Sequence, residues 1–143
     1  MSLFPSTGLY RISNFATDTV ADSYGGQKVE NNPVNGYKPH GGANQKWLFD
    51  KKSDDGQYTI RNDMSGMYLA YADQDLQDGI QVVTRNTSKL WRLIPGSQGW
   101  IIAAAQHDNF VLDMKESSSI EGTPVHLWTK LDALNQNWIL IPH

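Results

Sequence analysis

The sequence predicts an all-β chain built from three copies of one unit. Short runs that alternate apolar and polar residues recur between breaks rich in Gly, Asp and Asn, as strands and turns do. No stretch keeps an apolar period of about 3.6 residues over three turns, so long helices are not expected. When shifted by 91 residues, the chain also matches itself without a gap, with Gly8–Trp47 lying over Gly99–Trp138.

The first and second units open with alternating runs at Leu9–Ile12 and Tyr58–Arg61. These runs contain the aromatic and β-branched residues that favour strands. Further strands are expected at four segments: Gln81–Thr84, Trp91–Ile94, Phe110–Met114 and Trp138–Ile141. The units fill a single domain, residues 1–143, with repeats at about 8–55, 56–98 and 99–143.

Three units of this length predict a β-trefoil. Propellers also repeat with a period in the forties, but they close with about four to eight blades. Three units of about four strands can instead close as a threefold barrel capped by hairpins, which removes exposed sheet edges. Each unit ends on aromatic and aliphatic residues, which would meet in one shared core: Trp47–Phe49, Trp91–Leu93 and Trp138–Leu140.

A polar set recurs at fixed spacing in the first and third units. In the first unit an Asp is followed after 15 residues by a ring, after 22 and 23 by Asn and Gln, and after 25 by Trp: Asp22, Tyr37, Asn44, Gln45 and Trp47. The third unit repeats these spacings: Asp113, Trp128, Asn135, Gln136 and Trp138. A carboxylate, a ring and an amide at fixed spacing indicate the same small polar pocket in two places.

The middle unit keeps only the tryptophan of this set, Trp91. Ala70 stands in the place of the Asp, Arg85 in the place of the ring, and Ser88-Lys89 in the place of Asn-Gln. Every polar position has been lost together while the tryptophan remains. We therefore expect the second repeat to be structural and to carry no pocket of this kind.

With these motifs the chain resembles the ricin-B-type lectins, the sugar-binding branch of the β-trefoils. That family closes each repeat with a Gln-any-Trp motif preceded by Asn and, further upstream, by Asp. Asn44–Trp47 and Asn135–Trp138 carry it in full, and Gly122–Trp128 resembles the family's strand that leads to the stacking aromatic. Without cysteine, the chain is most similar to intracellular lectins of fungi, and the resemblance implies a role in defence.

The chemistry of the polar set suits a hexose. An ionised Asp can accept hydrogen bonds from two adjacent hydroxyls, and an Asn amide can complete their pairing. A ring placed opposite covers the sugar's C–H face. The resemblance implies terminal galactose or N-acetylgalactosamine, as in lactose or N-acetyllactosamine, whereas the residues alone permit other sugars. No metal or other cofactor is needed for this recognition.

The resemblance divides the other residues between site and scaffold. Asn35 and His126, two residues before each ring, take the position of a polar sugar contact in many relatives. Gly36, with Gly41 and Gly42, leaves room around the first ring for a larger glycan, so we expect the first site to bind at least as well as the second. The scaffold set consists of core tryptophans and turn-tying glutamines: Gln45, Trp47, Trp91, Gln136 and Trp138.

The charge and composition of the chain disfavour several classes of binding partner. The formal net charge is −3 and no cluster of Lys and Arg exceeds two neighbours, which disfavours nucleic acid. The longest apolar run, Trp100–Ala105, is far short of the roughly 20 residues that span a bilayer. The chain has no cysteine, and Met1–Tyr10 lacks the basic and apolar regions of a secretory signal, so a cytoplasmic location is expected. Two weak sites, or a homodimer, would bind clustered glycans by avidity.

Other functions find less support in the residues. A glycosidase needs a second acid near each Asp, and Glu30 and Glu121 do recur eight residues later, but we expect them to solvate loops. The scattered histidines match no zinc motif, and the acidic segment Asp73–Asp78 lacks the spacing of a calcium loop. A trefoil protease inhibitor or another protein-binding trefoil, acting through exposed loops, remains the alternative function.

Overall fold

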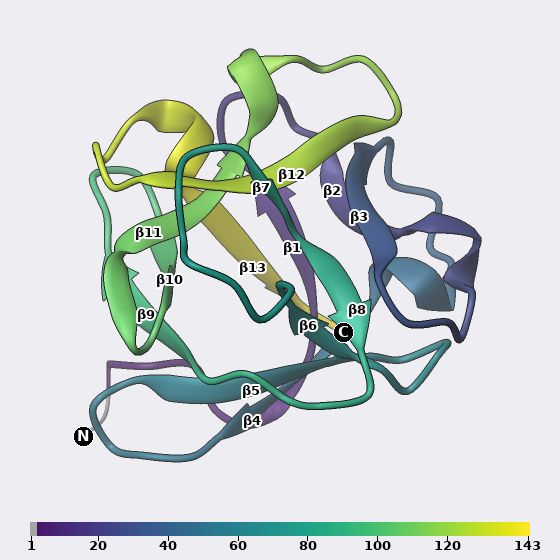
Figure 1. Cartoon of the computed structure of the whole chain (residues 1–143), viewed down its shortest axis with the longest axis horizontal. Coiled ribbons are helices and arrows are strands. Elements are labelled where there is room, and N and C mark those ends of the chain that lie inside the picture. Colours follow the sequence, from purple (N-terminus) through teal and green to yellow (C-terminus); the bar gives the residue numbers. More distant parts are fainter. Residues whose placement is uncertain (1–2) are drawn as a thin grey trace.

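The alternating runs fold into thirteen short strands within residues 3–143, the part of the chain that the computed structural model describes (Figure 1). The first two residues of the predicted domain, which also begin the segment Met1–Tyr10, lie outside the described residues. The remaining elements of the described part are four single-turn 3-10 helices. No helix among these residues is long and apolar enough to cross a membrane.

Each repeat contributes four or five strands. The first contains β1 (Gly8–Asn14), β2 (Val20–Ser23), β3 (Asn32–Tyr37) and β4 (Trp47–Lys51). The second contains β5 (Gln57–Asn62), β6 (Tyr68–Ala70), β7 (Ile80–Gln81), β8 (Val83–Arg85) and β9 (Trp91–Pro95). The third contains β10 (Trp100–Ala104), β11 (His107–Met114), β12 (Thr123–Thr129) and β13 (Trp138–Pro142). The 3-10 helices are η1 (Tyr24–Gly26), η2 (Ala43–Gln45), η3 (Lys115–Ser117) and η4 (Leu134–Gln136).

The first and last strands of the three repeats close a barrel. Its antiparallel pairs follow one another round the ring: β1–β4, β4–β5, β5–β9, β9–β10, β10–β13 and β13–β1. Closure pairs both edges of every barrel strand, so no edge is left to recruit another chain. Figure 1 shows β1 and β13, the two ends of the chain, running side by side.

The inner strands of each repeat form a hairpin, and the three hairpins cap the barrel. The hairpins β2–β3, β6–β8 and β11–β12 join one another through three further pairs: β3–β8, β3–β12 and β7–β12. The Gln81 amide nitrogen connects the three hairpins, because its two hydrogens are shared among equivalent carbonyl oxygens of all three repeats: Val34, Val82 and Val125, at 2.9–3.0 Å. This is a β-trefoil, as predicted.

The tryptophan that closes each repeat lies fully buried in the shared core. Each indole N–H donates to a backbone oxygen of its own repeat, in the pairs Trp47–Ala21, Trp91–Leu69 and Trp138–Leu112, at 2.9–3.1 Å. The residues that follow these acceptors are therefore equivalent: Asp22, Ala70 and Asp113. The structure thus aligns the middle repeat as its sequence predicts, with Ala70 in the place of the carboxylate.

Two details of the strands differ from the prediction. The expected strand Gln81–Thr84 is split into β7 and β8, because the backbone of Val82 bonds to the other two repeats instead of continuing one ladder. In the third repeat Ile102, not Ala103, is the equivalent of Ile12, since Ile102 pairs with Leu93 as Ile12 pairs with Leu140. A bulge between Ala103 and Ala104 then restores the offset of 91 residues before the polar set.

Candidate functional site

The hairpin of the first repeat places a carboxylate and a ring on one face. Asp22 of β2 lies directly opposite Asn35 of β3, and Val20 lies opposite Tyr37. Because residues two apart in a strand point to the same side, Asp22, Asn35 and Tyr37 share one face. The hairpin of the third repeat repeats this register, with Asp113 opposite His126 and Val111 opposite Trp128. The spacing of 15 residues is thus a diagonal pair across a hairpin.

A 3-10 turn then brings the Asn and Gln onto the carboxylate. In the first repeat η2 positions Asn44, whose amide nitrogen donates to Asp22 Oδ1 and to the Ser23 oxygen, both at 3.1 Å. Gln45 is fully buried, and its amide nitrogen donates to Asp22 Oδ2 at 2.9 Å and to the Lys38 oxygen at 3.0 Å. Its carbonyl oxygen accepts the N–H of His40, so Gln45 has no polar group left for a ligand.

The third repeat builds the same network from η4. Asn135 donates to Asp113 Oδ1 at 3.2 Å and to the Met114 oxygen at 2.9 Å. Gln136 donates to Asp113 Oδ2 at 3.0 Å and to the Thr129 oxygen at 2.9 Å. Each Asn amide has therefore spent both hydrogens on the protein, and only its carbonyl oxygen is free to receive a ligand hydroxyl.

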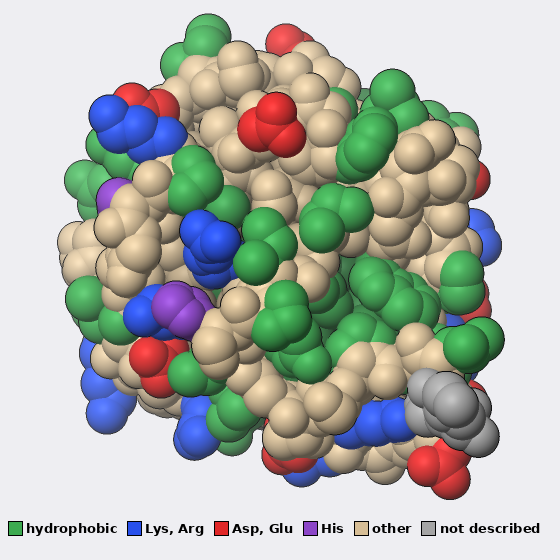
Figure 2. Space-filling view, turned by 180° about the vertical axis from the view of Figure 1, so that it is seen from behind, with side chains coloured by type: hydrophobic (Ala, Val, Ile, Leu, Met, Phe, Trp, Pro, Cys, Tyr) green, Lys and Arg blue, Asp and Glu red, His purple; other side chains and the backbone are tan. Residues whose placement is uncertain are grey.

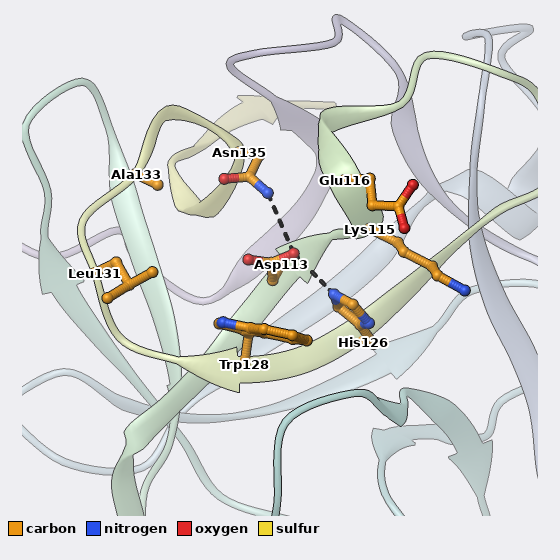
Figure 3. A pocket seen from close by; sticks show the side chains of 8 residues that line it. All are labelled: Asp113, Lys115, Glu116, His126, Trp128, Leu131, Ala133 and Asn135. Atoms are coloured by element: carbon orange, nitrogen blue, oxygen red, sulfur yellow. Dashed lines mark hydrogen bonds and ion pairs between the residues drawn. The ribbon is translucent and has the colours of Figure 1, made fainter.

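Both carboxylates open onto a cavity. Site 1, of about 350 Å³, is lined by residues from the first and third repeats: Asp22, Tyr24, Gly25, Asn35, Tyr37, His40, Asn44, Glu121 and Gly122. Site 3, of about 280 Å³, is lined by the third repeat alone: Asp113, Lys115, Glu116, His126, Trp128, Leu131, Ala133 and Asn135. Figure 3 shows Trp128 facing Asp113 across site 3, with an apolar side formed by Leu131 and Ala133 and a charged side formed by Lys115 and Glu116.

The two carboxylates differ in how many acceptor positions the protein occupies. Asp113 Oδ1 also binds His126 Nε2 at 2.8 Å, and the His126 ring stacks on Trp128 with centroids 5.3 Å apart. In site 1 the corresponding Asn35 makes no such bond within residues 3–143, and His40 Nε2 stays 3.7 Å from Asp22 Oδ2. A carboxylate offers about four lone pairs, so Asp22 keeps about two for a ligand and Asp113 about one.

The structure brings together most of the predicted site residues but not Gly36. This glycine is buried, and a Cβ added to it would stand 2.6 Å from the Met114 Cε atom. Gly36 therefore allows β3 to pack closely on the third repeat and does not line site 1. The room that we expected it to give a glycan is instead taken by a methionine of the core.

The second repeat carries an ion cluster where the other two carry the polar network. Lys89 Nζ lies 2.5 Å from Asp73 Oδ1, and Arg85 Nη1 lies 3.6 Å from Asp73 Oδ2. Lys89 also stands over the Tyr71 ring, 4.8 Å from its centroid. In the second repeat the cations of Arg85 and Lys89 therefore occupy the region where the first and third repeats present a free carboxylate and an open ring.

Two buried asparagines support the sites from neighbouring repeats, and the sequence analysis did not single them out. The side-chain amide of Asn62 in β5 donates to the backbone oxygen of Asn44 at 3.0 Å. The side-chain amide of Asn14 in β1 donates to the backbone oxygen of Asn135 at 2.9 Å. The equivalent residue in β10, opposite Trp91, is Ala104, which lies beside the repeat without a site. The sequence signal for this role was an Asn that ends the opening strand of the first and second repeats, Asn14 and Asn62, but not that of the third.

Asn62→Ala is expected to lower the free energy of unfolding by about 1–3 kcal/mol, because it leaves the Asn44 oxygen and the backbone N–H groups of Met64 and Ser65 without their partner. Urea unfolding measures the change. The matched control, Asn109→Ala, alters an exposed asparagine and should change stability by less than about 0.5 kcal/mol. Equal effects of the two substitutions would contradict the supporting role of Asn62.

The acidic residues Glu30, Asp78 and Glu121, outside the polar sets, are exposed, as expected of loop residues, but each also has a further role. Glu30 accepts the N–H of Asn86 at 2.9 Å, Asp78 accepts the N–H of Thr129 at 2.7 Å, and Glu121 lines site 1 instead of only solvating a loop. Within residues 3–143 no group of three or more His, Asp or Glu side chains is arranged to hold a metal ion.

Known proteins of the same fold carry this architecture. A family model described as ricin-type beta-trefoil lectin domain-like matches residues 3–84 and 43–128. The Rhizoctonia solani agglutinin is 35% identical, with a TM-score of 0.93 and 97% of each chain covered. The Macrolepiota procera ricin B-like lectin, solved in complex with lactose, is 28% identical, with a TM-score of 0.86, 97% of this chain and 98% of that chain covered.

A designed three-fold symmetric protein, ThreeFoil, is 25% identical, with a TM-score of 0.88, and covers 95% of this chain and 99% of its own. No curated protein sequence matches the chain. The family match spans most of the chain, from residue 3 to residue 128, and the fold agrees over nearly its whole length. The chain therefore belongs to the ricin-type β-trefoil lectin-like family.

Proposed function

We propose that the protein is a non-catalytic lectin that binds terminal galactose or N-acetylgalactosamine of glycans at site 1 and site 3. One observation carries the proposal: in both repeats an Asp, held by Gln and Asn, keeps free lone pairs toward an open cavity with a ring on the same face. Two adjacent sugar hydroxyls would donate to the carboxylate, and the ring would cover the C–H face.

The proposed specificity draws on relatives as well as on geometry. The Macrolepiota lectin was solved with lactose, a disaccharide that ends in galactose. An axial 4-hydroxyl lets vicinal hydroxyls reach the Asp while one C–H face stays flat against Tyr37 or Trp128. The partners would be galactose-containing glycans of glycoproteins or glycolipids, and a homodimer would add avidity to that of two sites.

Site 1 is proposed as the stronger of the two for a monosaccharide. Asp22 keeps about two acceptor positions and Asp113 about one, because His126 occupies the other. A bond to a charged acceptor contributes about 1.5–3 kcal/mol, so one additional bond outweighs the better stacking of Trp128 over Tyr37. Each site remains shallow, with dissociation constants near the millimolar range.

Calorimetric titration with lactose tests the proposal, with maltose as the control sugar because it lacks the axial 4-hydroxyl. We expect lactose heats that fit two weak sites and no heat with maltose. Equal binding of both sugars would contradict galactose recognition. Incubation with a labelled galactoside, followed by chromatography, tests the non-catalytic assignment, since Glu121 brings a second carboxylate to site 1. Release of free galactose would overturn it.

The protonation of Asp22 sets the pH range of site 1. Burial raises the pKa of Asp22 above its ordinary value of 3.8, although the bond from Gln45, the nearby His40 and the bond from Asn44 oppose the rise. The sugar needs the ionised form as an acceptor. Because the folded pKa is above the unfolded value, protonation of Asp22 as pH falls favours the folded state. Loss of sugar through this group therefore occurs without unfolding.

Lactose affinity of site 1 is expected to fall as pH is lowered from about 7 to about 4, and the midpoint should lie above the ordinary Asp pKa of 3.8. Titrations of Trp128→Ala, which retains only site 1, measure the change, and near-ultraviolet circular dichroism at each pH confirms that the fold persists. An affinity that stays constant over this range would contradict the role of the ionised Asp22.

A further inference from the structure

Site 1 contains a carboxylate that comes from another repeat. Glu121 lies two residues before Thr123, which pairs with Gly36 of β3, and the N–H of Gly122 donates to the Gly36 oxygen at 2.9 Å. The start of β12 is thereby held against the hairpin that carries Tyr37. This pairing places Glu121 in the lining of the same cavity as Asp22.

The same position is acidic in all three repeats. The backbone bonds Asn31–Thr84, Gly79–Leu127 and Gly122–Gly36 are equivalent, and the residues that precede their donors are Glu30, Asp78 and Glu121. Glu30 and Asp78 turn back onto backbone N–H groups of the next repeat, those of Asn86 at 2.9 Å and Thr129 at 2.7 Å. Asp78 also accepts the Thr129 hydroxyl at 2.8 Å.

Glu121 differs from its two equivalents because it makes no hydrogen bond or ion pair within residues 3–143, and its side chain is exposed. Site 1 therefore presents two carboxylates, those of Asp22 and Glu121, and no Lys or Arg lines it. The side chain in its lining that can carry a positive charge is His40, which becomes charged only when protonated.

Site 3 has a less negative rim. Lys115 and Glu116 line it together, and their formal charges cancel (Figure 3). The acid equivalent to Glu121 is Asp78, whose carboxylate is occupied by Thr129 and does not line the cavity. On the face that Figure 2 shows, charged side chains of both signs are scattered and form no large patch of one sign. The contrast between the sites comes from the side chains that line each cavity.

We propose that Glu121 is a specificity residue of site 1, which selects neutral galactosides against those that carry an anionic substituent, such as sialic acid or sulfate, while site 3 accepts both. The inference rests on the proposed function of these sites. A substituent on the 6-hydroxyl leaves the hydroxyls at positions 3 and 4 free for the Asp, so its charge would reach the rim without blocking the pocket. One chain would then bind neutral galactosides at site 1 and both neutral and anionic galactosides at site 3.

The experiment compares lactose with 6′-sialyllactose in proteins that retain one site each. Trp128→Ala leaves site 1, and Tyr37→Ala leaves site 3; neither changes a charge. Into each background we introduce Glu121→Gln or its matched control Glu30→Gln, which removes the same charge from the equivalent position of another repeat. The quantity compared is the ratio of the two dissociation constants, measured at about 20 mM and about 300 mM salt.

With site 1 alone, Glu121→Gln should lower the penalty against 6′-sialyllactose about three- to six-fold at low salt, and the gain should shrink at high salt, as expected for one charge near a screened rim. Glu30→Gln should leave the ratio unchanged, and with site 3 alone neither variant should change it. Normal lactose binding with equal ratios in both variants would overturn this inference only. Absence of lactose binding by the protein with site 1 alone would overturn the proposed function of that site and the inference with it.

Discussion

Simultaneous replacement of Asp22 and Asp113 by Ala is expected to lower lactose affinity at least about 100-fold, below detection by calorimetry. Each carboxylate would accept sugar hydroxyls through charge-assisted bonds of about 1.5–3 kcal/mol. The other carboxylates that line the cavities, Glu121 in site 1 and Glu116 in site 3, lie outside the paired strands that carry the Asp and the ring. Asp22→Ala alone should remove more of the titration heat than Asp113→Ala, since Asp22 keeps more free lone pairs.

The matched control for these variants is Asp73→Ala, which removes a carboxylate from the ion cluster of the second repeat. It should leave lactose binding unchanged. Because both site aspartates are buried and bonded to Gln and Asn, Asp→Asn variants, which keep the shape, accompany the Ala variants, and thermal unfolding reports whether each is folded. Lactose binding by a folded double variant that equals the wild type would refute both sites.

Trp91→Ala is expected to lower the free energy of unfolding by about 3–5 kcal/mol without removing a sugar site. Trp91 is fully buried, donates to the Leu69 oxygen at 2.9 Å and packs edge-on against Tyr71, yet its repeat has no polar network. Urea unfolding measures the loss. If Trp91→Ala does not fold, Trp91→Phe keeps the ring and forfeits only the N–H bond, for about 1–3 kcal/mol.

Trp128→Ala is the comparison for this prediction, because it truncates a partly exposed tryptophan at the rim of site 3. We expect it to abolish binding at that site while the free energy of unfolding falls by less than the change for Trp91→Ala. The two substitutions separate the tryptophans of the fold from the ring of the site. Equal loss of stability in both variants would show that this separation is wrong.

The repeat made much of the fold and of the candidate site predictable. A spacing of 15 residues from Asp to ring corresponds to a diagonal pair across a hairpin, and the Asn-Gln that follows reaches the same Asp through a single turn. Such local contacts depend on few residues and recur wherever the spacing recurs. The loss of the set in the second repeat was predictable for the same reason, and the structure fills that place with Asp73, Arg85 and Lys89.

Other features escaped the sequence analysis because their pattern carries no period. Strand β2 is buried on both faces and shows no alternation of apolar and polar residues, so its sequence does not predict a strand. In β10 the run Trp100–Ala104 is apolar throughout, and its register was found only from its partners β9 and β13. Gly36 was assigned to the site because it precedes a ring, whereas Met114 of another repeat determines its role.

The sequence by itself determined the β-trefoil, its three repeats and two polar sets, since these follow from spacing within one unit. Only the tertiary structure decided which residues of different repeats meet at the sites: Asn62 bonded to Asn44, Asn14 bonded to Asn135, and Glu121 in the lining of site 1. The physical reason is that barrel closure brings each hairpin against its neighbour, and contacts between repeats have no fixed spacing along the chain. The hydrogen-bond network of Asp, Asn and Gln could therefore be predicted from the sequence, whereas the difference between its two copies comes from packing between repeats.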